Sequence, residues 1–453
     1  MSFKKLNRIF NPKTIALIGA TDRPGSVGLG ICKNLLEGKK DRKIFFVNPF
    51  RKKVFGQKSY DVIGSIKEPI DLVIVVVPAK IVLKVIKEVV REKVGGIIII
   101  SAGFAEAGKE GKILQDKIIE TVKKVDIPLV GPNCLGILRP SINLNASFAP
   151  VSPQEGKIAF ISQSGALVDS IIDRSFVENY GFSLIVSYGN EAGLSMCDFL
   201  EWAKDDPKTK AIGVYVEAIK DGRRFMRVAR EVVKKKPLLI LKAGKTKTGQ
   251  KAVSSHTAAL AGSQKICSAA FKQVGALEVD SLEELFDNLE ALAWQPRCKN
   301  GIAVLTNGGG CGVLVADYCE KLGVKLSKLD QKVFRKLEKS KIMHPSFSRG
   351  NPLDIIGDAL SDRYELAMEV LLSQKNVHGL IVAQTLQTMT EVEENAKVTI
   401  AAKKRWPKKP IIALFMGGKY ILPGEKMLEK NKIPNYSDPR RAALAISALI
   451  KNK

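Results

Sequence analysis

The sequence predicts an α/β protein of three consecutive domains, each built around a mainly parallel sheet. Short β-branched runs alternate along the whole chain with segments of helical period, which is the pattern of parallel strands joined by helices. The chain of 453 residues has the length of roughly three domains of ~150 residues. Its apolar fraction of 45% can fill several cores. We expect domains at 1–150, 151–297 and 298–453.

The first domain contains five strand-like runs, with amphipathic segments such as 80–93 and 112–124 between them. A polar stretch with two prolines, 143–157, marks its end. The expected strands are TIALIGA (14–20), KIFFVNP (43–49), DLVIVVVP (71–78), GIIIISAG (96–103) and IPLVGPN (127–133).

The second and third domains repeat the same alternation. The expected strands of the second are KIAFIS (157–162), FSLIVSYGN (182–190), AIGVYVEA (211–218), KPLLILKAG (236–244) and ALEVDS (276–281). Those of the third begin at GIAVLTN (301–307), VHGLIVAQ (377–384) and PIIALFMGG (410–418). Because ligands of parallel sheets gather at the carboxyl ends of strands, the loops after these runs are the places to look for function.

Composition narrows the class of protein. No apolar run reaches the ~18 residues of a membrane span, and the N-terminus lacks a secretory apolar core, so we expect a cytoplasmic protein that binds no membrane. The seven cysteines include no C-x-x-C pair, which argues against zinc and disulfides. The net charge of +26 is spread over the chain and is mostly lysine, which disfavours nucleic acid. A solvated lysine surface and attraction of a polyanionic molecule or acidic partner both remain open.

The first strand leads into a glycine-rich loop, GATDRPGSVG, at the start of a helix. Gly19, Gly25, Ser26, Gly28 and Gly30 let backbone N–H groups approach a phosphate there. The G-x-G-x-x-G spacing of dinucleotide folds is absent, and no acidic residue follows the second strand. Arg51, Lys52 and Lys53 stand in its place, which suits the extra phosphate of NADP or coenzyme A (CoA). An NADP-dependent dehydrogenase is therefore one alternative.

An ordered set of motifs makes CoA the better choice. GATDRPGSVG, NP, VPA, SAGFAE, GPNCLG, ISQSGA, VEAIKDG and a glycine-bracketed histidine segment follow one another from residue 19 to residue 263. In this order they resemble the alpha-type chain of the ADP-forming acyl-CoA synthetases, the acetate–CoA ligases that make ATP. They are similar, more distantly, to the succinyl-CoA synthetase alpha subunit. The resemblance implies a Rossmann-like CoA-binding domain followed by two flavodoxin-like ligase domains.

The resemblance also implies which residues bind CoA. The phosphates would contact Gly19, Thr21, Gly25 and Ser26, with Asn48 and Arg51 or Lys52 near a further phosphate. The pantetheine arm would pass Pro78, Ala102, Gly103 and Asn133.

His256 lies in the segment GQKAVSSHTAALAGS (249–263), whose small side chains and flanking glycines we interpret as a mobile loop. Neutral imidazole is a good nucleophile near pH 7, since its pKa is ~6.5. The resemblance implies that this histidine is phosphorylated. A capping or half-buried histidine is the alternative, and His344 and His378 are interpreted as structural.

A catalytic histidine needs an orienting partner, commonly a carboxylate. Glu217 ends the strand AIGVYVE and is the candidate, with Asp169 and Glu191 less suited. Phosphate needs hydroxyls and N–H groups at a helix start. The candidates for this seat are Ser162, Gln163, Ser164 and Gly165, with a second turn at Gly189 and Asn190. The similar turn at 307–312 is interpreted as packing or interface.

The implied reaction is acyl-CoA + phosphate + ADP ⇌ carboxylic acid + CoA + ATP, through acyl phosphate and phosphohistidine. The sequence contains no G-x-x-x-x-G-K-[ST] and no segment resembling an ATP-grasp domain. ADP with its Mg²⁺ is therefore expected on a separate beta chain, in an α₂β₂ heterotetramer, and no metal site is expected here. The alternatives are a succinyl-CoA synthetase-like ligase of another acid and a non-catalytic CoA-sensing module.

Overall fold

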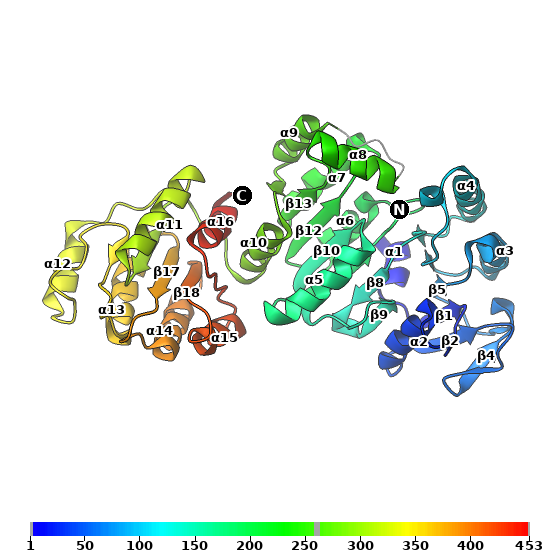
Figure 1. Ribbon diagram of the computed structural model, residues 1–453, viewed down its shortest axis with the longest axis horizontal. Helices are drawn as coiled ribbons and strands as arrows, with labels where there is room; N and C mark the ends of the chain where they lie inside the picture. Colours follow the sequence, from blue (N-terminus) through cyan, green and yellow to red (C-terminus); the bar gives the residue numbers. More distant parts are fainter. Residues whose placement is uncertain (1–2, 258–262, 452–453) are drawn as a thin grey trace. The chain divides into compact units, whose positions relative to one another are not determined.

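The computed structural model describes the backbone of residues 3–257 and 263–451, and the side chains of residues 5–253 and 263–451. The chain divides into two compact units, Met1–Asp280 and Ser281–Lys453 (Figure 1). The predicted α/β class is confirmed, because both units consist of mainly parallel sheets covered by helices. No helix in the described part of the chain is long and apolar enough to cross a membrane.

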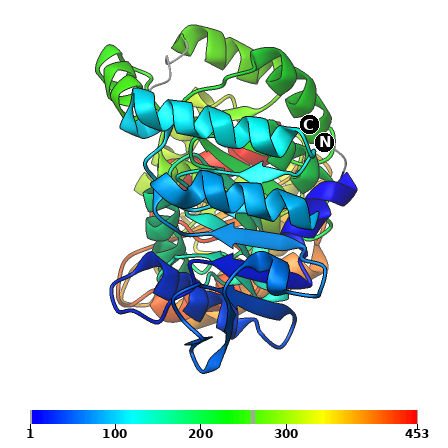
Figure 2. The same ribbon diagram turned by 90° about the vertical axis from the view of Figure 1, so that its right-hand side faces the viewer.

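The first sheet of unit 1 has seven strands in the order β3-β4-β2-β1-β5-β6-β7. All neighbours are parallel except the short hairpin of β3 and β4. Figure 2 shows α3 and α4 side by side on one face of this sheet. The strands are β1 Thr14–Ile18, β2 Lys43–Val47, β3 Lys53–Val54, β4 Gln57–Tyr60, β5 Leu72–Val75, β6 Ile97–Ile99 and β7 Leu129–Val130. The helices are α1 Phe3–Phe10, α2 Val27–Glu37, α3 Ala79–Val89 and α4 Lys109–Lys123, with 3-10 turns η1 Ile63–Ser65, η2 Val90–Glu92 and η3 Ala105–Ala107.

The second sheet of unit 1 also has seven strands, in the order β14-β13-β12-β10-β11-β8-β9. Its strands β10 to β14 are parallel and mostly buried, and β8 and β9 extend the sheet as antiparallel strands beside β11. The strands are β8 Gly136–Arg139, β9 Leu144–Ser147, β10 Glu155–Ser162, β11 Phe182–Ser187, β12 Ala211–Val216, β13 Leu238–Lys242 and β14 Leu277–Val279. The helices are η4 Pro140–Ile142, α5 Gly165–Val177, α6 Met196–Asp205, α7 Gly222–Val233, α8 Lys247–Thr257 and α9 Gln264–Val274.

Strands β8 and β9 correct the expected course of the first domain. They fall inside 1–150, yet β8 pairs with β11 of the second sheet and β9 pairs with β8, which covers the edge of the buried strand β11. Arg139 on β8 pairs with Asp206 at 2.8 Å, with both side chains buried. Asn34 on α2 donates to the carbonyls of Ser147 and Ala149, each at 2.9 Å. The β8–β9 segment is therefore attached to both halves of unit 1, and the boundary near 150 stays a prediction.

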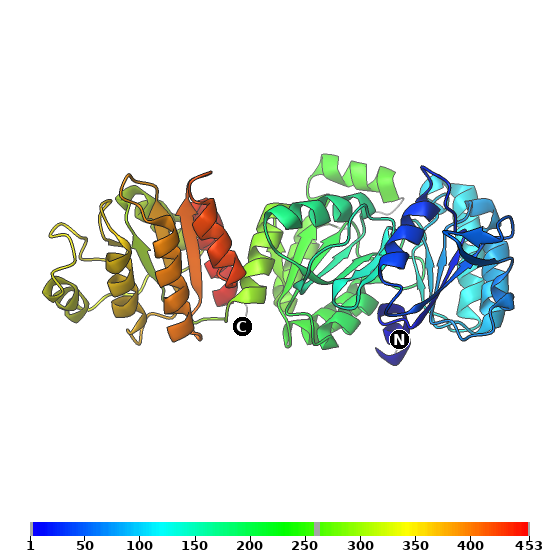
Figure 3. The same ribbon diagram turned by 90° about the horizontal axis from the view of Figure 1, so that it is seen from below.

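Unit 2 holds a parallel sheet of four strands in the order β16-β15-β17-β18. Helices α10, α11 and α16 pack together as one group, and α13, α14 and α15 as a second (Figure 3). The strands are β15 Ala303–Thr306, β16 Leu353–Asp354, β17 Leu380–Thr385 and β18 Ile411–Met416. The helices are α10 Leu282–Trp294, α11 Gly309–Lys321, α12 Gln331–Lys339, α13 Ser361–Leu372, α14 Val392–Arg405, α15 Leu422–Lys430 and α16 Pro439–Lys451.

Helix α10 lies inside the expected second domain, 151–297, whose boundary stays a prediction, and its contacts group it with unit 2. The reason is a buried polar anchor at Asp287. Its carboxylate accepts two hydrogen bonds from Arg441, at 2.6 and 2.7 Å, and its carbonyl accepts one from the Tyr436 hydroxyl at 2.7 Å. A paired, bidentate contact of this kind is directional, so it fixes the helix to α16.

Candidate functional site

The loop between β1 and α2 has the geometry of an anion cradle. Gly19 has φ +93°, and a Cβ there would lie 2.4 Å from the Val76 carbonyl oxygen, so only glycine fits. Ser26 is the N-cap of α2, and its hydroxyl accepts a hydrogen bond from the Leu29 N–H at 3.3 Å. Gly25 has φ +72°, with open space where its Cβ would point. An approaching phosphate would therefore meet backbone N–H groups and the positive end of a helix.

The residues after β2 divide into a clamp and a group of cations. Asn48 donates to the Ala20 carbonyl at 2.8 Å and accepts from the Phe50 N–H at 2.9 Å, so it ties this turn to the cradle loop. Arg51 forms an ion pair with Asp22 inside that loop. Lys52 and Lys53 are exposed. The structure thus places Arg51 beside the cradle loop, and which of the three cations would contact an anion stays a prediction.

The residues predicted along the pantetheine arm lie on neighbouring strands. Pro78 follows β5 and precedes α3, Ala102 and Gly103 follow β6, and Asn133 follows β7. Since β5, β6 and β7 are adjacent and parallel, these residues share one edge of the sheet with Gly19 after β1. The structure therefore brings the predicted CoA residues together.

The predicted phosphate turn after β10 is built by its own side chains. The Ser162 hydroxyl donates to the Ser164 carbonyl at 2.8 Å and accepts from the Ser164 N–H at 3.1 Å. Ser164 is the N-cap of α5. The Gln163 amide oxygen accepts from the N–H groups of Glu217 and of Ala218, the latter at 3.1 Å. The turn is therefore locked to the end of β12, where Glu217 lies.

Glu217 is a buried carboxylate, 4% exposed, directly after β12. The Tyr215 hydroxyl donates to its Oε1 at 3.4 Å. Burial, and then the negative charge of Glu217, raise the pKa of Tyr215 to about 12. A buried carboxylate at a strand end needs hydrogen-bond donors, so this position suits the orientation of a protonated imidazole nitrogen.

The expected loop 249–263 is corrected in part, because α8 covers Lys247–Thr257 and so includes the backbone of His256. Thr246 starts this helix: its hydroxyl accepts from the Gly249 N–H at 3.1 Å, and its carbonyl accepts from the Gln250 N–H at 2.8 Å. The His256 side chain and residues 258–262 lie outside the described residues.

The turn after β11 is a junction between the two sheets of unit 1. Gly189 has φ +54°, and a Cβ there would lie 2.1 Å from the Asn133 carbonyl oxygen. Both N–H donors of the Asn190 amide are used, one on Glu106 and one on Gln115 at 3.0 Å. The Asn190 side chain is therefore engaged between the two sheets, and the phosphate role of Gly189 and Asn190 stays a prediction.

Three comparisons with known proteins identify the family. The family model "CoA binding domain" matches residues 13–140, "Succinyl-CoA ligase like flavodoxin domain" matches 155–292, and "Ligase-CoA domain" matches 302–448. The alpha subunit of the ADP-forming acetate–CoA ligase II of Pyrococcus furiosus is 41% identical over 450 residues, which is 98% of this chain and 97% of that subunit. The chain belongs to the family of ADP-forming acetate–CoA ligases. The resemblance found in the motifs is confirmed, and the dehydrogenase alternative is wrong.

Other members of this ligase family agree with the match. The dinucleotide-forming acetyl-coenzyme A synthetase 1 of Ca. Korarchaeum cryptofilum, solved in complex with phosphate and ADP, is 36% identical with a TM-score of 0.94. It covers 99% of this chain, and this chain covers 96% of it. The ADP-forming acetate–CoA ligase I of Archaeoglobus fulgidus is 40% identical over 98% of this chain. This chain spans 63% of that longer relative. The predicted domain order is confirmed by the ligase family.

The similar turn that the sequence shows at 307–312, in unit 2, repeats hydrogen bonds of the turn at 162–165. Thr306 donates to the Gly308 carbonyl and accepts from its N–H, both at 3.0 Å, as Ser162 does with Ser164. The Asn307 amide oxygen accepts from the Thr385 N–H at 2.7 Å, as Gln163 does at the neighbouring strand. The signal was present as a hydroxyl residue, an amide residue and a small residue after a strand. Asn307 is buried, and the turn shares the geometry of 162–165.

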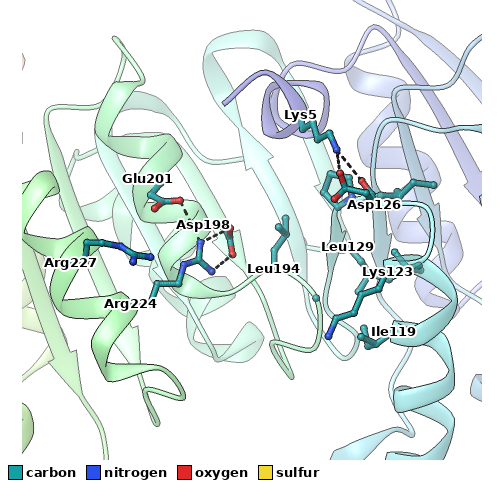
Figure 4. A pocket seen from close by; sticks show the side chains of 14 residues that line it. Lys5, Ile119, Lys123, Asp126, Leu129, Leu194, Asp198, Glu201, Arg224 and Arg227 are labelled. Carbon is teal, nitrogen blue, oxygen red and sulfur yellow. Dashed lines mark hydrogen bonds and ion pairs between the residues drawn. The ribbon is translucent and has the colours of Figure 1, made fainter. Parts of the chain in front are cut away.

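A cavity of about 640 Å³ lies elsewhere in unit 1, between α4, α6 and α7 (Figure 4). On one wall Arg224 donates to Asp198 at 2.7 Å, and on the other Lys5 is paired with Asp126. Its lining residues differ from those predicted for CoA and phosphate. A search for the site by cavity volume alone would therefore have selected a region other than the predicted CoA and phosphate residues.

Asp169, on α5, provides a prediction about pH. Burial raises its pKa to about 6 from 3.8, and its Oδ1 is buried without a hydrogen-bond partner. The unfolded chain therefore releases this proton at lower pH than the folded one, so stability falls as pH rises from about 4 to about 6. We expect Asp169→Asn to unfold at a higher temperature than the wild type at pH 8, by a margin that shrinks at pH 4. The exposed Asp173→Asn variant is the control, and an equal margin at both pH values would contradict the assignment.

Proposed function

We propose that the chain is the alpha chain of an ADP-forming acyl-CoA synthetase that converts acetyl-CoA, phosphate and ADP to acetate, CoA and ATP. The observation that carries the proposal is the placement of two anion cradles, at Ser26 and at Ser164, on the carboxyl edges of neighbouring sheets within unit 1. The first would hold the phosphates of CoA and the second inorganic phosphate. Acetate is proposed as the acid because relatives of this chain are acetate–CoA ligases.

In the first half of the proposed reaction, phosphate attacks the thioester carbonyl. The C–S bond breaks, CoA leaves as a thiolate that takes up a proton, and acyl phosphate forms. The helix N-terminus at Ser164 would hold the phosphate, so that negative charge is stabilised without rearrangement. The hydrogen bond from the Ala218 N–H to Gln163 holds the turn of Ser162–Ser164 against the end of β12, which supports this role. A turn that is already rigid loses little entropy when phosphate binds.

In the second half, a ring nitrogen of His256 attacks phosphorus and the carboxylate leaves, which gives phosphohistidine. Glu217 would accept the N–H of the other ring nitrogen and stabilise the positive charge that develops on the ring. Its burial supports this role, because an ion pair in a water-poor site is stronger than one in solvent.

The proposal places the nucleotide on a partner. The Pyrococcus furiosus relative is named a subunit alpha, and this chain spans only part of the longer Archaeoglobus fulgidus relative. No group of three His, Cys, Asp or Glu side chains in the described part of the chain could hold a metal ion. A beta chain with an ATP-grasp domain would therefore hold ADP and Mg²⁺ and receive the phosphoryl group from His256. We propose an α₂β₂ heterotetramer in the cytoplasm.

Mass spectrometry of the full chain after incubation with acetyl-CoA and phosphate tests the proposal. The wild type should gain one acid-labile phosphoryl group on His256. Glu217→Gln keeps the shape and removes the charge, so it should gain the group at least about tenfold more slowly, a loss of ~1.4 kcal/mol at the transition state. The exposed Glu231→Gln variant on α7 should behave as the wild type.

The outcomes separate two claims. A wild-type chain that stays unlabelled would contradict the proposed chemistry and favour a CoA-sensing module. Labelling of Glu217→Gln at the wild-type rate would contradict only the orienting role of Glu217.

A further inference from the structure

Glu106 fixes the loop that is proposed to carry the pantetheine arm. It lies in η3, just after β6, and its Oε1 accepts hydrogen bonds from the N–H groups of Gly103 at 2.6 Å and Phe104 at 3.1 Å. Gly103 has φ +103°, a conformation that side chains rarely adopt. One carboxylate oxygen therefore holds the loop by two adjacent peptide groups.

The other oxygen of Glu106 reaches the second sheet. Its Oε2 accepts from the Asn190 amide, whose second hydrogen is donated to Gln115 at 3.0 Å. The Asn190 amide oxygen accepts from Asn133 at 3.2 Å. The nitrogen and the oxygen of the Asn190 side-chain amide are thus both hydrogen-bonded between the two sheets, so Asn190 is a fixed joint between them.

Two further contacts extend this joint towards the proposed phosphoryl chemistry. The Lys220 ammonium donates to the carbonyls of Asn190 at 2.7 Å and Glu191 at 3.1 Å, and Lys220 lies in the segment that follows Glu217. The η3 turn that carries Glu106 also contacts α8, the helix that includes the backbone of His256. Glu106 therefore lies where the CoA loop, the turn after β11 and α8 meet.

Glu106 is ionised at neutral pH. Burial raises its pKa, but hydrogen bonds from Asn190, Gly103 and Phe104 outweigh burial, and the pKa lies below its usual value. A carboxylate can only accept hydrogen bonds, and here it accepts from three N–H donors. A side chain that donates at either oxygen position would break at least one of these hydrogen bonds. Replacing one carboxylate oxygen of Glu106 with an amide NH₂ group, as in Glu106→Gln, should therefore disrupt these hydrogen bonds.

We infer that Glu106 is a positioning residue that couples CoA binding on the first sheet to phosphate binding on the second. The inference rests on the proposed function. CoA that orders the Gly103 loop would order Glu106, which holds Asn190 and with it the segment after Glu217. Part of the conformational entropy that the phosphate site loses on binding phosphate is then already lost when CoA binds. Because coupling is reciprocal, phosphate should tighten CoA binding by the same factor.

Calorimetry of the full chain with CoA, with and without inorganic phosphate, measures the coupling. In the wild type, phosphate should tighten CoA binding by at least about threefold, within the usual range of coupling between sites. In Glu106→Gln the factor should fall to one, because the new amide can place a donor against the Asn190 donor. The exposed Glu110→Gln variant, at the start of α4, should keep the wild-type factor.

The exchanged pair Glu106→Gln with Asn190→Asp provides the rescue. Its glutamine amide can donate to the new carboxylate, so the hydrogen bond is restored with reversed direction, and the coupling factor should return. If Glu106→Gln does not fold, Asn190→Ala breaks the same bond from the other side and should also give a factor of one. A purely structural role would lower the unfolding temperature of these variants and leave the factor intact.

The results that overturn the inference differ from those that overturn the proposed function. A wild-type chain that does not bind CoA would remove both. CoA binding without any effect of phosphate in the wild type would remove the inference alone. So would a phosphate effect that is equal in the wild type and Glu106→Gln.

Discussion

We expect His256→Ala to abolish ATP formation by the chain combined with the proposed beta chain. The phosphoryl group then has no carrier between the acyl phosphate and ADP, and loss of a residue that forms a covalent intermediate lowers turnover by about 10³-fold or more. Coupled detection of ATP from acetyl-CoA, phosphate and ADP measures the loss. Slow formation of acyl phosphate should persist, since phosphate rather than histidine attacks the thioester.

Two other histidines provide the controls for this experiment. His344 accepts a hydrogen bond from the Ser346 N–H at 3.1 Å, and His378 follows the turn before β17. Both lie in unit 2, and alanine at either position should leave ATP formation close to that of the wild type. More than a few per cent of activity in His256→Ala would contradict the relay.

Ser26→Asp weakens CoA binding by at least about tenfold, ~1.4 kcal/mol, and leaves the fold intact. Aspartate is as good an N-cap as serine, so α2 keeps its start, but a negative charge now occupies the place proposed for a phosphate. Calorimetry with CoA measures the affinity, and thermal unfolding measures the fold.

The matched control is Ser26→Asn, which also caps a helix and has nearly the same shape as aspartate without the charge. It should bind CoA within about threefold of the wild type, since one good cap replaces another. Equal binding by the two variants would mean that this loop is only a turn between a strand and a helix.

Much of the site could be predicted because its signals are local. The positive φ of Gly19 and Gly25 requires glycine, which is visible in the sequence. A small hydroxyl residue after a strand likewise marks a helix N-cap such as Ser164. Glu217 could be chosen because a carboxylate directly after a buried strand is unusual. These features depend on a few neighbouring residues, and the sequence shows those residues together.

The rest depends on contacts between distant segments. Nothing near Asn190 in the sequence indicates that its amide would be used by Glu106 and Gln115, which are separated from it by 84 and 75 residues. The pairing of β8 with β11 likewise depends on the exposed edge of the second sheet, which β8 covers. The residues of β8 alone do not show which sheet this strand will join. Residues 249–257 contain good helix formers such as Gln250, Lys251 and Ala252, and they form part of α8. The flanking glycines and small side chains instead favoured the prediction of a mobile loop.

The attachment of the β8–β9 segment has a consequence for the evolution of modular enzymes. The boundary between the two matched family domains falls between residues 140 and 155, and β9 lies inside that interval. A genetic exchange there would separate Arg139 from Asp206 and leave a buried charge without its counterion, which is strongly destabilising. Gene fusion and fission within this lineage should therefore spare residues 136–147. We expect the compact unit Met1–Asp280 to be inherited as a whole.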